Sequence, residues 1–540
     1  MHLIKETIPF EDTHFFSPMA VDYVGKDSKV SIFINEFPSL AGIETQIERR
    51  RKSFSQPAYK AAHRNLLHQV LLQQYHLTEM HPEVKKHIDL LCSEKTFTIC
   101  TAHQPCIFTG PLYFIYKIAQ TIALAKACSD RYTDYHFVPV FYMGSEDNDL
   151  DEIGTVHIDR QLLKWTTAQR GACGRMGTDD LQLLTQQVLS MLDLNREEEA
   201  WLSHLLERAY MKGHTLSDAI RILVNGLFEN HGLVILNADD QQLKSVFAPL
   251  IEDELFNRNS SALVQQSNAE IASHYKVQAG GRDINLFYLN DQLRERIEKK
   301  GERWVVHDTA ISFSAAELQA EVRQHPERFS PNVILRPVYQ EMLLPNVAFI
   351  GGGGELAYWL ELKKVFEHYD IPYPLIFLRN SFLWIDQKAQ ALIKKLNLTN
   401  KELFSPAEQL YQTFLSENEQ MLKLDKQLHQ LENDYLEIEK LSLEISPNLN
   451  TSVKAHHAKA RRISARIEQK FRAHLKRAES DKVSTADKIK EILFPDGTLQ
   501  ERHDHFLPYF KKYGRQFIEA LIQYQSVADS EFIILKEKDI

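Results

Sequence analysis

Cysteines and long apolar runs are both scarce in this sequence. The 540 residues include five cysteines, and none of them forms the C-x-x-C pair that is typical of zinc and dithiol sites. No stretch approaches the ~18 consecutive apolar residues of a membrane-spanning helix. The first residues lack the layout of a signal peptide. These absences predict a globular protein of the reducing cytoplasm that has no membrane partner.

Several catalytic motifs are absent as well. The sequence has no G-x-S-x-G and no H-E-x-x-H, so serine-hydrolase and zinc-protease functions have no support. Gly351–Gly354 is not followed by Gly-Lys-Ser or Gly-Lys-Thr, which excludes a Walker A loop. His503 and His505 resemble a metal-binding pair only loosely because no third ligand is near in sequence, and we expect no metal site. The net charge of −10 disfavours general nucleic-acid binding.

Five short apolar runs are the main structural signal in the chain. They are Phe97–Cys100, His136–Met143, Gly232–Leu236, Val347–Ile350 and Pro374–Leu378. Helical patterns separate them, and this alternation is typical of a parallel sheet with crossover helices. The carboxyl ends of parallel strands meet at one sheet edge, where ligands bind in α/β folds. The sequence therefore predicts an α/β core in which the residues after these runs share one cleft.

The first candidate site residues follow the run that ends at Cys100. His103 and Gln104 lie in a polar loop, and Gly110-Pro111 begins a helix whose unpaired N–H groups suit an anion. His103 is either a ligand-binding or acid–base residue, or a loop histidine whose hydrogen bonds go to the backbone. Lys117, about two turns into the helix, either reaches back to the anion or points to solvent.

Carboxylates gather after the second apolar run. Glu146, Asp147, Asp149, Asp151 and Glu152 lie so close together that their repulsion requires a compensating ammonium, Mg²⁺ or arginine. Asp149 and Glu152 also have the three-residue spacing of a helix cap. We expect these two to cap a helix, while Glu146 and Asp147 face the cleft.

Glycines and arginines complete the predicted cleft. Gly351–Gly354 permits close approach of the backbone to a ligand. Glu355, at the start of the next helix, suits an amine or a hydroxyl rather than an anion. Arg336 and Arg379 are the natural anchors for carboxylates or phosphates, and Arg282 and Arg294 are weaker candidates.

The second half of the chain contains a heptad pattern. A first arm at about 406–446 is acidic and a second arm at about 451–480 is basic, with a break at 446–450. Their apolar spacing and opposite charges predict an antiparallel coiled-coil hairpin. The basic arm pairs with the acidic arm or a second subunit, or it binds nucleic acid. The predicted seam residues are Leu428, Leu431, Tyr435 and Ile438, then Val453, His456 or His457, Ala460, Ile463, Ile467 and Phe471.

These patterns divide the chain into three parts. We expect the α/β core over residues 1–380, with helical insertions at about 160–228 and 241–330. The coiled-coil hairpin domain spans residues 381–484. Residues 485–540 form a return segment that packs near the coiled coil or the core.

Six motifs, read in order, resemble one known family. They are T-A-H-Q-P-C-I-F-T-G-P-L-Y-F-I-Y-K (101–117), F-V-P-V-F-Y-M-G-S-E-D-N-D-L-D-E-I (137–153), G-A-C-G-R-M (171–176), S-P-N-V-I-L-R-P-V-Y-Q-E-M-L-L-P (330–345), G-G-G-G-E-L-A-Y-W (351–359) and L-F-P-D-G-T-L-Q-E-R (493–502). Together they resemble the cysteine-adding enzyme of bacillithiol biosynthesis, the BshC family. Many members have Gly-Gln-Gln where this chain has Ala102-His103-Gln104, which favours Gln104 over His103 as an essential residue.

The resemblance implies a fold and an activity. The implied fold is a Rossmann-like core, similar to class I aminoacyl-tRNA synthetases, plus a coiled-coil domain that forms a homodimer. The implied reaction joins L-cysteine to the amine of glucosaminyl malate in the last step of bacillithiol biosynthesis, with ATP and Mg²⁺ as expected cofactors. The chain lacks the K-M-S-K-S loop of the synthetases, so their ATP chemistry does not transfer directly.

Two other functions remain open at this point. One is another adenylating ligase or nucleotidyltransferase on the same fold, and the other is a non-catalytic nucleotide-binding scaffold built around the hairpin. For the ligase, the predicted catalytic residues are Glu146, Asp147 and His103. The predicted substrate-binding residues are Gln104, Gly110, Pro111, Tyr113, Lys117, Asp239, Arg336, Gln340, Gly353, Gly354, Glu355, Tyr358 and Arg379.

Overall fold

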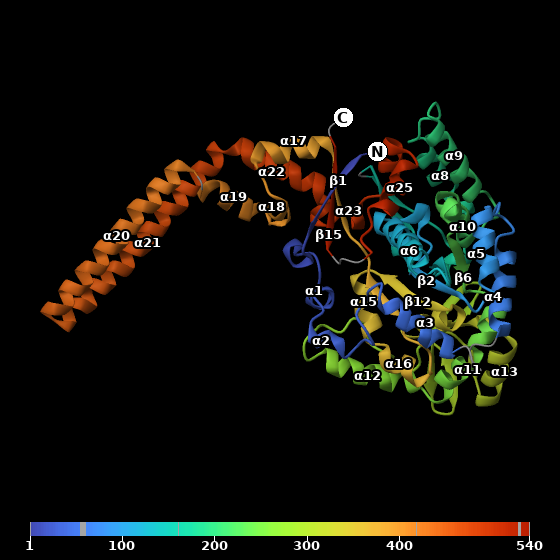
Figure 1. The fold of residues 1–540 in the computed structure, drawn as a ribbon. Coiled ribbons are helices and arrows are strands. Elements are labelled where there is room, and N and C mark those ends of the chain that lie inside the picture. Colours follow the sequence, from blue (N-terminus) through green and yellow to red (C-terminus); the bar gives the residue numbers. More distant parts are fainter. Residues whose placement is uncertain (1, 54–60, 160, 417, 528–530, 539–540) are drawn as a thin grey trace.

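A parallel sheet forms the centre of the molecule (Figure 1). The computed structural model describes residues 2–53, 61–159, 161–416, 418–527 and 531–538. The sheet has five strands in the order β13–β12–β2–β3–β6, and every neighbouring pair is parallel. The strands are β2 (Thr96–His103), β3 (His136–Met143), β6 (Val234–Asn237), β12 (Asn346–Gly351) and β13 (Leu375–Leu378). These are the five predicted apolar runs, so the predicted Rossmann-like sheet is confirmed.

The strand order places a switch point in the middle of this sheet. Along the chain, β2, β3 and β6 extend the sheet in one direction, and β12 and β13 then extend it from the other side of β2. In such folds the crossover connections diverge at the switch point and leave a crevice at the carboxyl ends of the strands. The gap after β2 and β12 is therefore the expected place for a ligand.

Helices cover the sheet because one face of each is apolar. The helix α6 (Leu112–Arg131) packs against β2 and β3 with Ile115, Ile118 and Ile122 buried. The helix α3 (Gly42–Ser53) packs against β12 and β13, while α4 (Ala61–Gln74) and α10 (Leu216–Phe228) contact β6. No helix in the described ranges is both long and apolar enough to cross a membrane.

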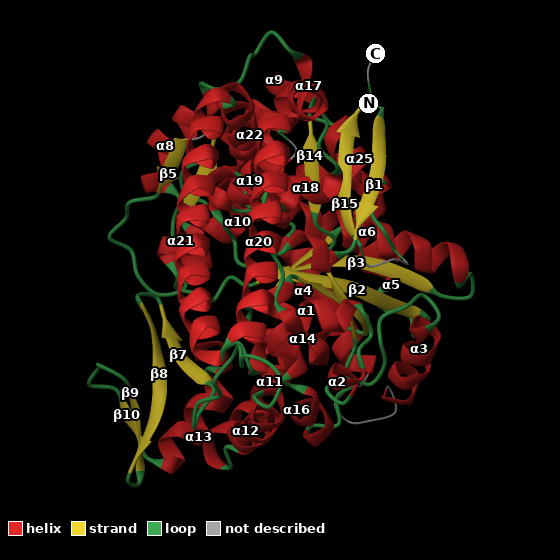
Figure 2. Ribbon diagram, turned by 90° about the vertical axis from the view of Figure 1, so that its left-hand side faces the viewer, coloured by secondary structure: helices red, strands yellow, loops and turns green. Residues whose placement is uncertain are grey.

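The second insertion differs from the prediction. Residues 241–330 contain the helices α11 (Gln241–Phe256), α12 (Asn259–Ile271) and α13 (Ala315–Gln324), but also an antiparallel five-stranded sheet (Figure 2). Its strands are β7 (Leu286–Asn290), β8 (Leu293–Lys300), β9 (Arg303–Val306), β10 (Ser312–Phe313) and β11 (Phe329–Pro331). In the charged strand β8, Leu293 and Ile297 are four residues apart, a helical spacing that concealed the strand.

The first insertion is mostly helical, as expected. It begins with the strand β5 (Gln161–Lys164), which pairs with β4 (Thr155–Ile158), and continues into α8 (Gln182–Leu189), α9 (Glu197–Ala209) and α10.

A third sheet joins the two ends of the chain. Its order is β1–β15–β14, with β1 (Leu3–Ile8), β15 (Phe532–Glu537) and β14 (Phe382–Ile385). The first strand thus pairs with the last one rather than with the central sheet. The preceding C-terminal helices α23 (Gln500–His503) and α25 (Gln516–Gln523) contact α6 of the core.

Two long helices project from the rest of the molecule as an antiparallel pair (Figure 1). They are α20 (Glu419–Ile445) and α21 (Pro447–Ala478), and α17 (Gln387–Leu396), α18 (Asn400–Phe404), α19 (Ala407–Ser416) and α22 (Ser480–Leu493) lie at their base. The predicted five-residue break is wrong. Ser446 alone separates the helices because its Oγ caps α21 by accepting from Leu449 N, and Pro447 takes the first helical position.

The predicted hairpin seam is correct only in part. Tyr435 and His457 lie in the seam with their rings stacked at 5.0 Å, and Val453 and Ala460 are half-buried. Leu431, Ile438, Ile463, Ile467 and Phe471 are exposed instead. Polar side chains occupy the seam in their place, including Glu432, Glu439, Ser442 and Asn450. The predicted pairing of the arms is confirmed, because Glu432 binds Arg461 and His457.

Candidate active site

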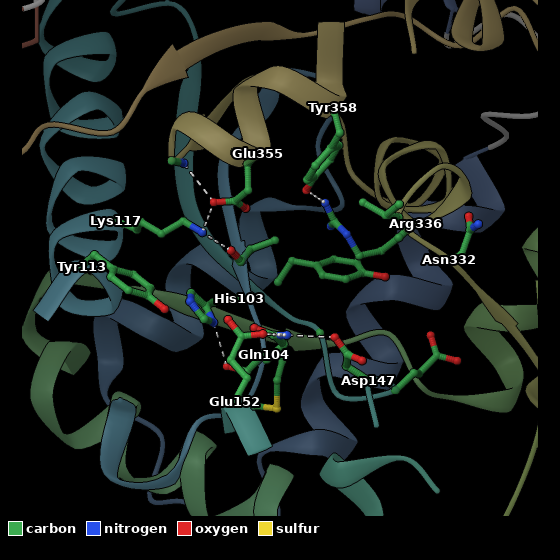
Figure 3. Close-up of a pocket in the computed structure, with 18 of the residues that line it drawn as sticks. His103, Gln104, Tyr113, Lys117, Asp147, Glu152, Asn332, Arg336, Glu355 and Tyr358 are labelled. Carbon is green, nitrogen blue, oxygen red and sulfur yellow. Dashed lines mark hydrogen bonds and ion pairs between the residues drawn. The ribbon is translucent and has the colours of Figure 1, made fainter. Parts of the chain in front are cut away.

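A pocket of about 530 Å³ opens at the switch point (Figure 3). Residues that follow β2, β3 and β12 line it together with residues of α6, α14 (Leu335–Leu343) and α15 (Gly353–Leu360). The predicted site residues found in its lining are His103, Gln104, Tyr113, Lys117, Glu146, Asp147, Arg336, Gly353, Gly354, Glu355, Tyr358 and Arg379. The ends of β2, β3, β12 and β13 thus share one cleft, but Asn237 and Asp239 at the end of β6 lie outside it, so the prediction that all five strand ends share the cleft is wrong for β6.

His103 ends β2 and lies against Tyr113, with ring centroids 5.2 Å apart. Its Nδ1 is 3.2 Å from the backbone oxygen of Gln104. Burial and the nearby Lys117 ammonium hold the pKa of His103 well below its usual range. The imidazole is therefore neutral near pH 7, which suits a hydrogen bond to a ligand and disfavours the predicted role as an acid.

Gln104 connects two carboxylates at one side of the pocket. Its Nε2 donates to Asp147 Oδ2 at 2.9 Å and to Glu152 Oε2 at 3.1 Å. Arg294 Nη1 lies 3.6 Å from Asp147, whereas Glu152 forms no ion pair with any lysine or arginine in the described part of the chain. The acidic run was predicted to divide into a helix cap (Asp149 and Glu152) and two cleft residues (Glu146 and Asp147), and this division holds in part. Glu152 N donates to Asp149 at a helix start, yet the carboxylate of Glu152 also lines the pocket.

Glu146 is already neutralised from inside the protein. Lys244 of α11 is fully buried, and its Nζ donates to Glu146 Oε1 at 2.5 Å and to the backbone oxygen of Phe329 at 2.8 Å. Burial raises the pKa of Glu146, and the Lys244 ammonium opposes that rise. This pairing makes Glu146 a poor candidate for a free catalytic base.

Lys117 and Glu355 form a second internal pair. Lys117 is buried, and its Nζ donates at 2.5 Å both to Glu355 Oε2 and to the backbone oxygen of Ala102 (Figure 3). The same Glu355 oxygen accepts from Gly352 N at 2.9 Å, so it caps α15. Lys117 therefore reaches back toward the strand ends and does not point to solvent. Its charge is compensated there by Glu355.

Unlike Lys117 and Arg379, Arg336 has a positive charge that no described carboxylate of the pocket pairs with. Its Nη1 donates to Gln340 Oε1 at 2.9 Å and its Nη2 donates to the Tyr358 hydroxyl at 3.0 Å. The guanidinium also lies 5.5 Å from the centroid of the Tyr142 ring. Across the described ranges no carboxylate pairs with Arg336. Its charge is thus available to an anionic ligand.

Arg379 is not the free anchor that the sequence predicts. Its Nη1 and Nη2 donate to the two carboxylate oxygens of Glu501 at 2.8 and 2.6 Å, and both side chains are buried. A two-point contact of this kind satisfies the guanidinium and compensates its charge. Although Arg379 reaches the pocket wall, its role is to fasten the C-terminal segment to the core.

Four other predicted residues lie outside the pocket lining. Gly110 and Pro111 do not offer an anion cradle, because Leu112 N, the first amide of α6, donates to the backbone oxygen of Asp504 at 2.8 Å. Asp239 is bound at both carboxylate oxygens by Arg175, at 2.7 and 2.6 Å. Gln340 is fully buried behind Arg336.

The sequence analysis missed several residues of the pocket. Asn332 and Arg502 line the pocket. Both lie inside motifs that carry the family resemblance, at 330–345 and 493–502, so that resemblance was a usable signal. Lys244 lies outside the lining but pairs with Glu146, and it carried no local signal because that partner is 98 positions away in the chain.

Comparisons with known proteins agree with this architecture. The family model described as "Bacillithiol biosynthesis BshC, N-terminal Rossmann-like domain" matches residues 3–380. The model described as "Bacillithiol biosynthesis BshC, C-terminal coiled-coil domain" matches residues 382–537. The two models together span almost the whole chain.

Curated relatives have the same extent as this chain. Proteins named "Putative cysteine ligase BshC" from Flavobacterium johnsoniae and Cytophaga hutchinsonii are 36% and 37% identical over 532 residues. The alignment covers 98% of this chain with each, and 99% and 98% of the two relatives. The protein of the same name from Chlorobaculum tepidum is 30% identical over 487 residues, 85% of this chain and 86% of its own length. The chain therefore belongs to the BshC family of bacillithiol biosynthesis, whose curated members are named as cysteine ligases.

Proposed function

We propose that this pocket joins L-cysteine to the amine of glucosaminyl malate, in the last step of bacillithiol biosynthesis. One observation carries the proposal. The pocket sets a guanidinium without a carboxylate partner, on Arg336, opposite the carboxylates of Asp147 and Glu152, which Gln104 links. Glucosaminyl malate has the complementary groups, because it carries carboxylates at one end and an amine at the other.

Arg336 would bind a malate carboxylate. Charge-assisted hydrogen bonds from a fixed guanidinium are among the stronger polar contacts in proteins. Asn332, three residues before α14, lines the same wall, but its Nδ2 already donates to Asn285 Oδ1 at 2.8 Å, so Arg336 is the main polar group there. Arg379, which the sequence also favoured for this role, is excluded from it by its contact with Glu501.

Asp147 and Glu152 would hold the sugar amine and accept its proton. The amine nitrogen uses its lone pair to form the new C–N bond at the cysteine carboxyl carbon, and the leaving group departs with the electrons of the bond that breaks. The proton released by the nitrogen passes to the Asp147 carboxylate, which reaches the pocket and is 36% exposed. Glu146 and Glu355 are less suitable because each is hydrogen-bonded to a buried lysine.

We further propose ATP and Mg²⁺ as cofactors. ATP would supply the leaving group that makes the cysteine carboxyl reactive. The backbone at Gly353 and Gly354 begins α15, and a Cβ added at Gly353 would meet open space, so a ligand has room to approach the chain closely there. Arg502, exposed at the pocket, adds a positive charge. No group of three metal-binding side chains occurs in the described ranges, so Mg²⁺ would enter bound to the ATP phosphates.

The proposal is tested by a turnover assay with the purified full-length chain. Mass spectrometry would follow bacillithiol formation from L-cysteine and glucosaminyl malate, with Mg-ATP and without ATP. We expect product only with ATP. Arg336→Met should lower kcat/KM by about 30- to 150-fold, since a hydrogen bond to a charged group contributes about 2–3 kcal/mol.

Glu408→Gln is the matched control, because Glu408 belongs to an exposed ion pair at the hairpin base and should leave turnover unchanged. Full turnover by Arg336→Met would contradict the assigned carboxylate site. Pyrophosphate release with a different acceptor, and none with glucosaminyl malate, would instead indicate another adenylating ligase. The scaffold hypothesis has lost its main support, because Arg461 on the basic arm is already bound by Glu432.

A further inference from the structure

The orientation of Arg336 depends on neutral partners. Its two terminal nitrogens donate to an amide oxygen on Gln340 and to a hydroxyl on Tyr358. Arg379, by contrast, is oriented by the carboxylate of Glu501. Both arginines are fixed in position, but only Arg336 keeps an uncompensated charge.

Gln340 is itself held in one orientation. Its Nε2 donates to Glu341 Oε1 at 2.9 Å, while its Oε1 accepts from Arg336. An amide has one acceptor end and one donor end, so a carboxylate on one side and a guanidinium on the other permit only this arrangement. The amide dipole is thereby aligned between the two charges, which strengthens both hydrogen bonds in a dry interior.

Glu341 is anchored from two further elements. Asn346, at the start of β12, donates through Nδ2 to Glu341 Oε1 at 2.8 Å. Arg50 of α3 forms an ion pair with Glu341 Oε2 and donates through Nε to the backbone oxygen of Asn346 at 2.6 Å. Gln340, Glu341, Asn346 and Arg50 are all fully buried. A rigid, fully paired group of side chains thus stands behind Gln340.

We propose that Gln340 is a positioning residue that holds Arg336 for an anionic substrate without neutralising it. The inference rests on the proposed function, in which Arg336 binds a substrate carboxylate. A carboxylate at position 340 would orient Arg336 equally well but would consume its charge, as Glu501 does at Arg379. A neutral amide backed by Glu341 supplies the orientation and leaves the charge to the ligand. Such preorganisation improves affinity because less freedom is lost on binding.

The test compares ligand affinities of full-length variants by isothermal titration calorimetry. L-malate serves as the dicarboxylate probe, and L-cysteine serves as the second ligand. Gln340→Met keeps the volume of the side chain but removes both hydrogen bonds, while Asn346 and Arg50 still satisfy Glu341. We expect malate to bind about tenfold more weakly, the effect of roughly one hydrogen bond, and cysteine to bind as before.

The matched control is Thr98→Val on β2. Thr98 is fully buried, and its Oγ1 donates to Asn346 Oδ1 at 3.2 Å, so the variant removes a hydrogen bond from the same group without touching Gln340 or Arg336. Its malate affinity should stay within about twofold of the wild type. Should Gln340→Met fail to fold, Gln340→Asn keeps an amide but shortens its reach, and the same loss of malate affinity is expected.

Several outcomes would overturn the proposal. One is unchanged malate affinity in a folded Gln340 variant, and another is an equal loss in Thr98→Val, which would indicate a general structural effect. Equal weakening of malate and cysteine would also contradict it. If the wild type binds malate but makes no product in the turnover assay, only the proposed function fails. If the wild type does not bind malate at all, the positioning role of Gln340 fails, and the turnover assay alone decides the proposed function.

Discussion

The parallel-sheet core and the helical hairpin use the same kinds of side chains in opposite ways. In the core, apolar residues are inside, and buried charges such as Arg379 and Glu501 form ion pairs. In the hairpin, polar groups such as Glu439 and Asn450 lie between the two helices. Many of its large apolar side chains are exposed, and Ile445 is 75% exposed.

This difference shows which region buries its apolar surface within one copy of the chain. The core buries its apolar surface and satisfies its ion pairs internally, so its stability depends on particular buried contacts. The hairpin leaves many large apolar side chains in water, a pattern that marks an interaction surface. They are Leu422, Leu431, Leu436, Ile438, Leu441, Leu443, Ile445, Leu449, Ile463, Ile467 and Phe471. We propose that a second copy of the chain covers them, giving a homodimer.

The largest effect should come from breaking a buried pair in the core. Glu501→Gln leaves the buried Arg379 guanidinium without its carboxylate, and losing one partner of such a pair costs about 3–5 kcal/mol. The free energy of unfolding, measured by urea denaturation with tryptophan fluorescence, should fall by that amount.

Glu408→Gln makes the same chemical change in an exposed pair, where Lys476 lies 3.1 Å away. Its unfolding midpoint should match the wild type, because solvent screens such pairs. Equal losses in the two variants would remove the distinction between core and hairpin.

The next effect should appear in the assembly state. Replacing both Leu441 and Ile463 by lysine puts charge onto the apolar face of the hairpin. Each buried Leu or Ile contributes about 1.5–3 kcal/mol, so the dimer should weaken by about 100-fold or more and become monomeric at micromolar concentration. Size-exclusion chromatography with light scattering measures this directly.

Gln430→Lys with Ser452→Lys is the control for that experiment, since it adds the same charges at exposed polar positions of the same two helices. It should remain dimeric. A wild-type protein that is already a monomer would contradict the proposed role of the apolar face.

Much of the core could be predicted because its signals are local. Each central strand is a run of apolar residues, and polar residues follow it directly, so the five strands and the shared cleft were predicted from short segments. His103, Asp147 and Glu355 lie in the pocket because they follow strands whose ends converge at the switch point.

Contacts between distant segments could not be predicted. Arg379 looked like a free anchor until Glu501, 122 positions later in the chain, was found beside it. Gly110 and Pro111 looked like an anion cradle until the carbonyl of Asp504 was found on the next amide. In the hairpin, the predicted seam included Leu431, but the register of the two helices turns the neighbouring Glu432 inward instead.

The smallest effect should be a pH dependence within the hairpin seam. His457 is buried there, with Nε2 2.8 Å from Glu432 and Nδ1 2.6 Å from Glu439. Hydrogen bonds to Glu432 and Glu439 raise the pKa of His457 above its usual value. The protonated form therefore stabilises the folded hairpin. This contribution is fully present below the unfolded pKa of about 6.5 and is lost as the pH rises through the folded value.

An NMR titration of the imidazole, assigned by comparison with His457→Gln, should give a midpoint above 6.5. The advantage of the wild type over His457→Gln in thermal unfolding should also shrink between pH 6 and pH 9. A midpoint at or below 6.5 would mean that water screens these carboxylates as it does on an open surface. The seam would then lack the fixed polar contacts that make it comparable to the core. A raised midpoint would show that His457 keeps its contacts with Glu432 and Glu439 in solution. The hairpin would then have a fixed polar seam, as the core has fixed ion pairs, although many of its apolar side chains are exposed.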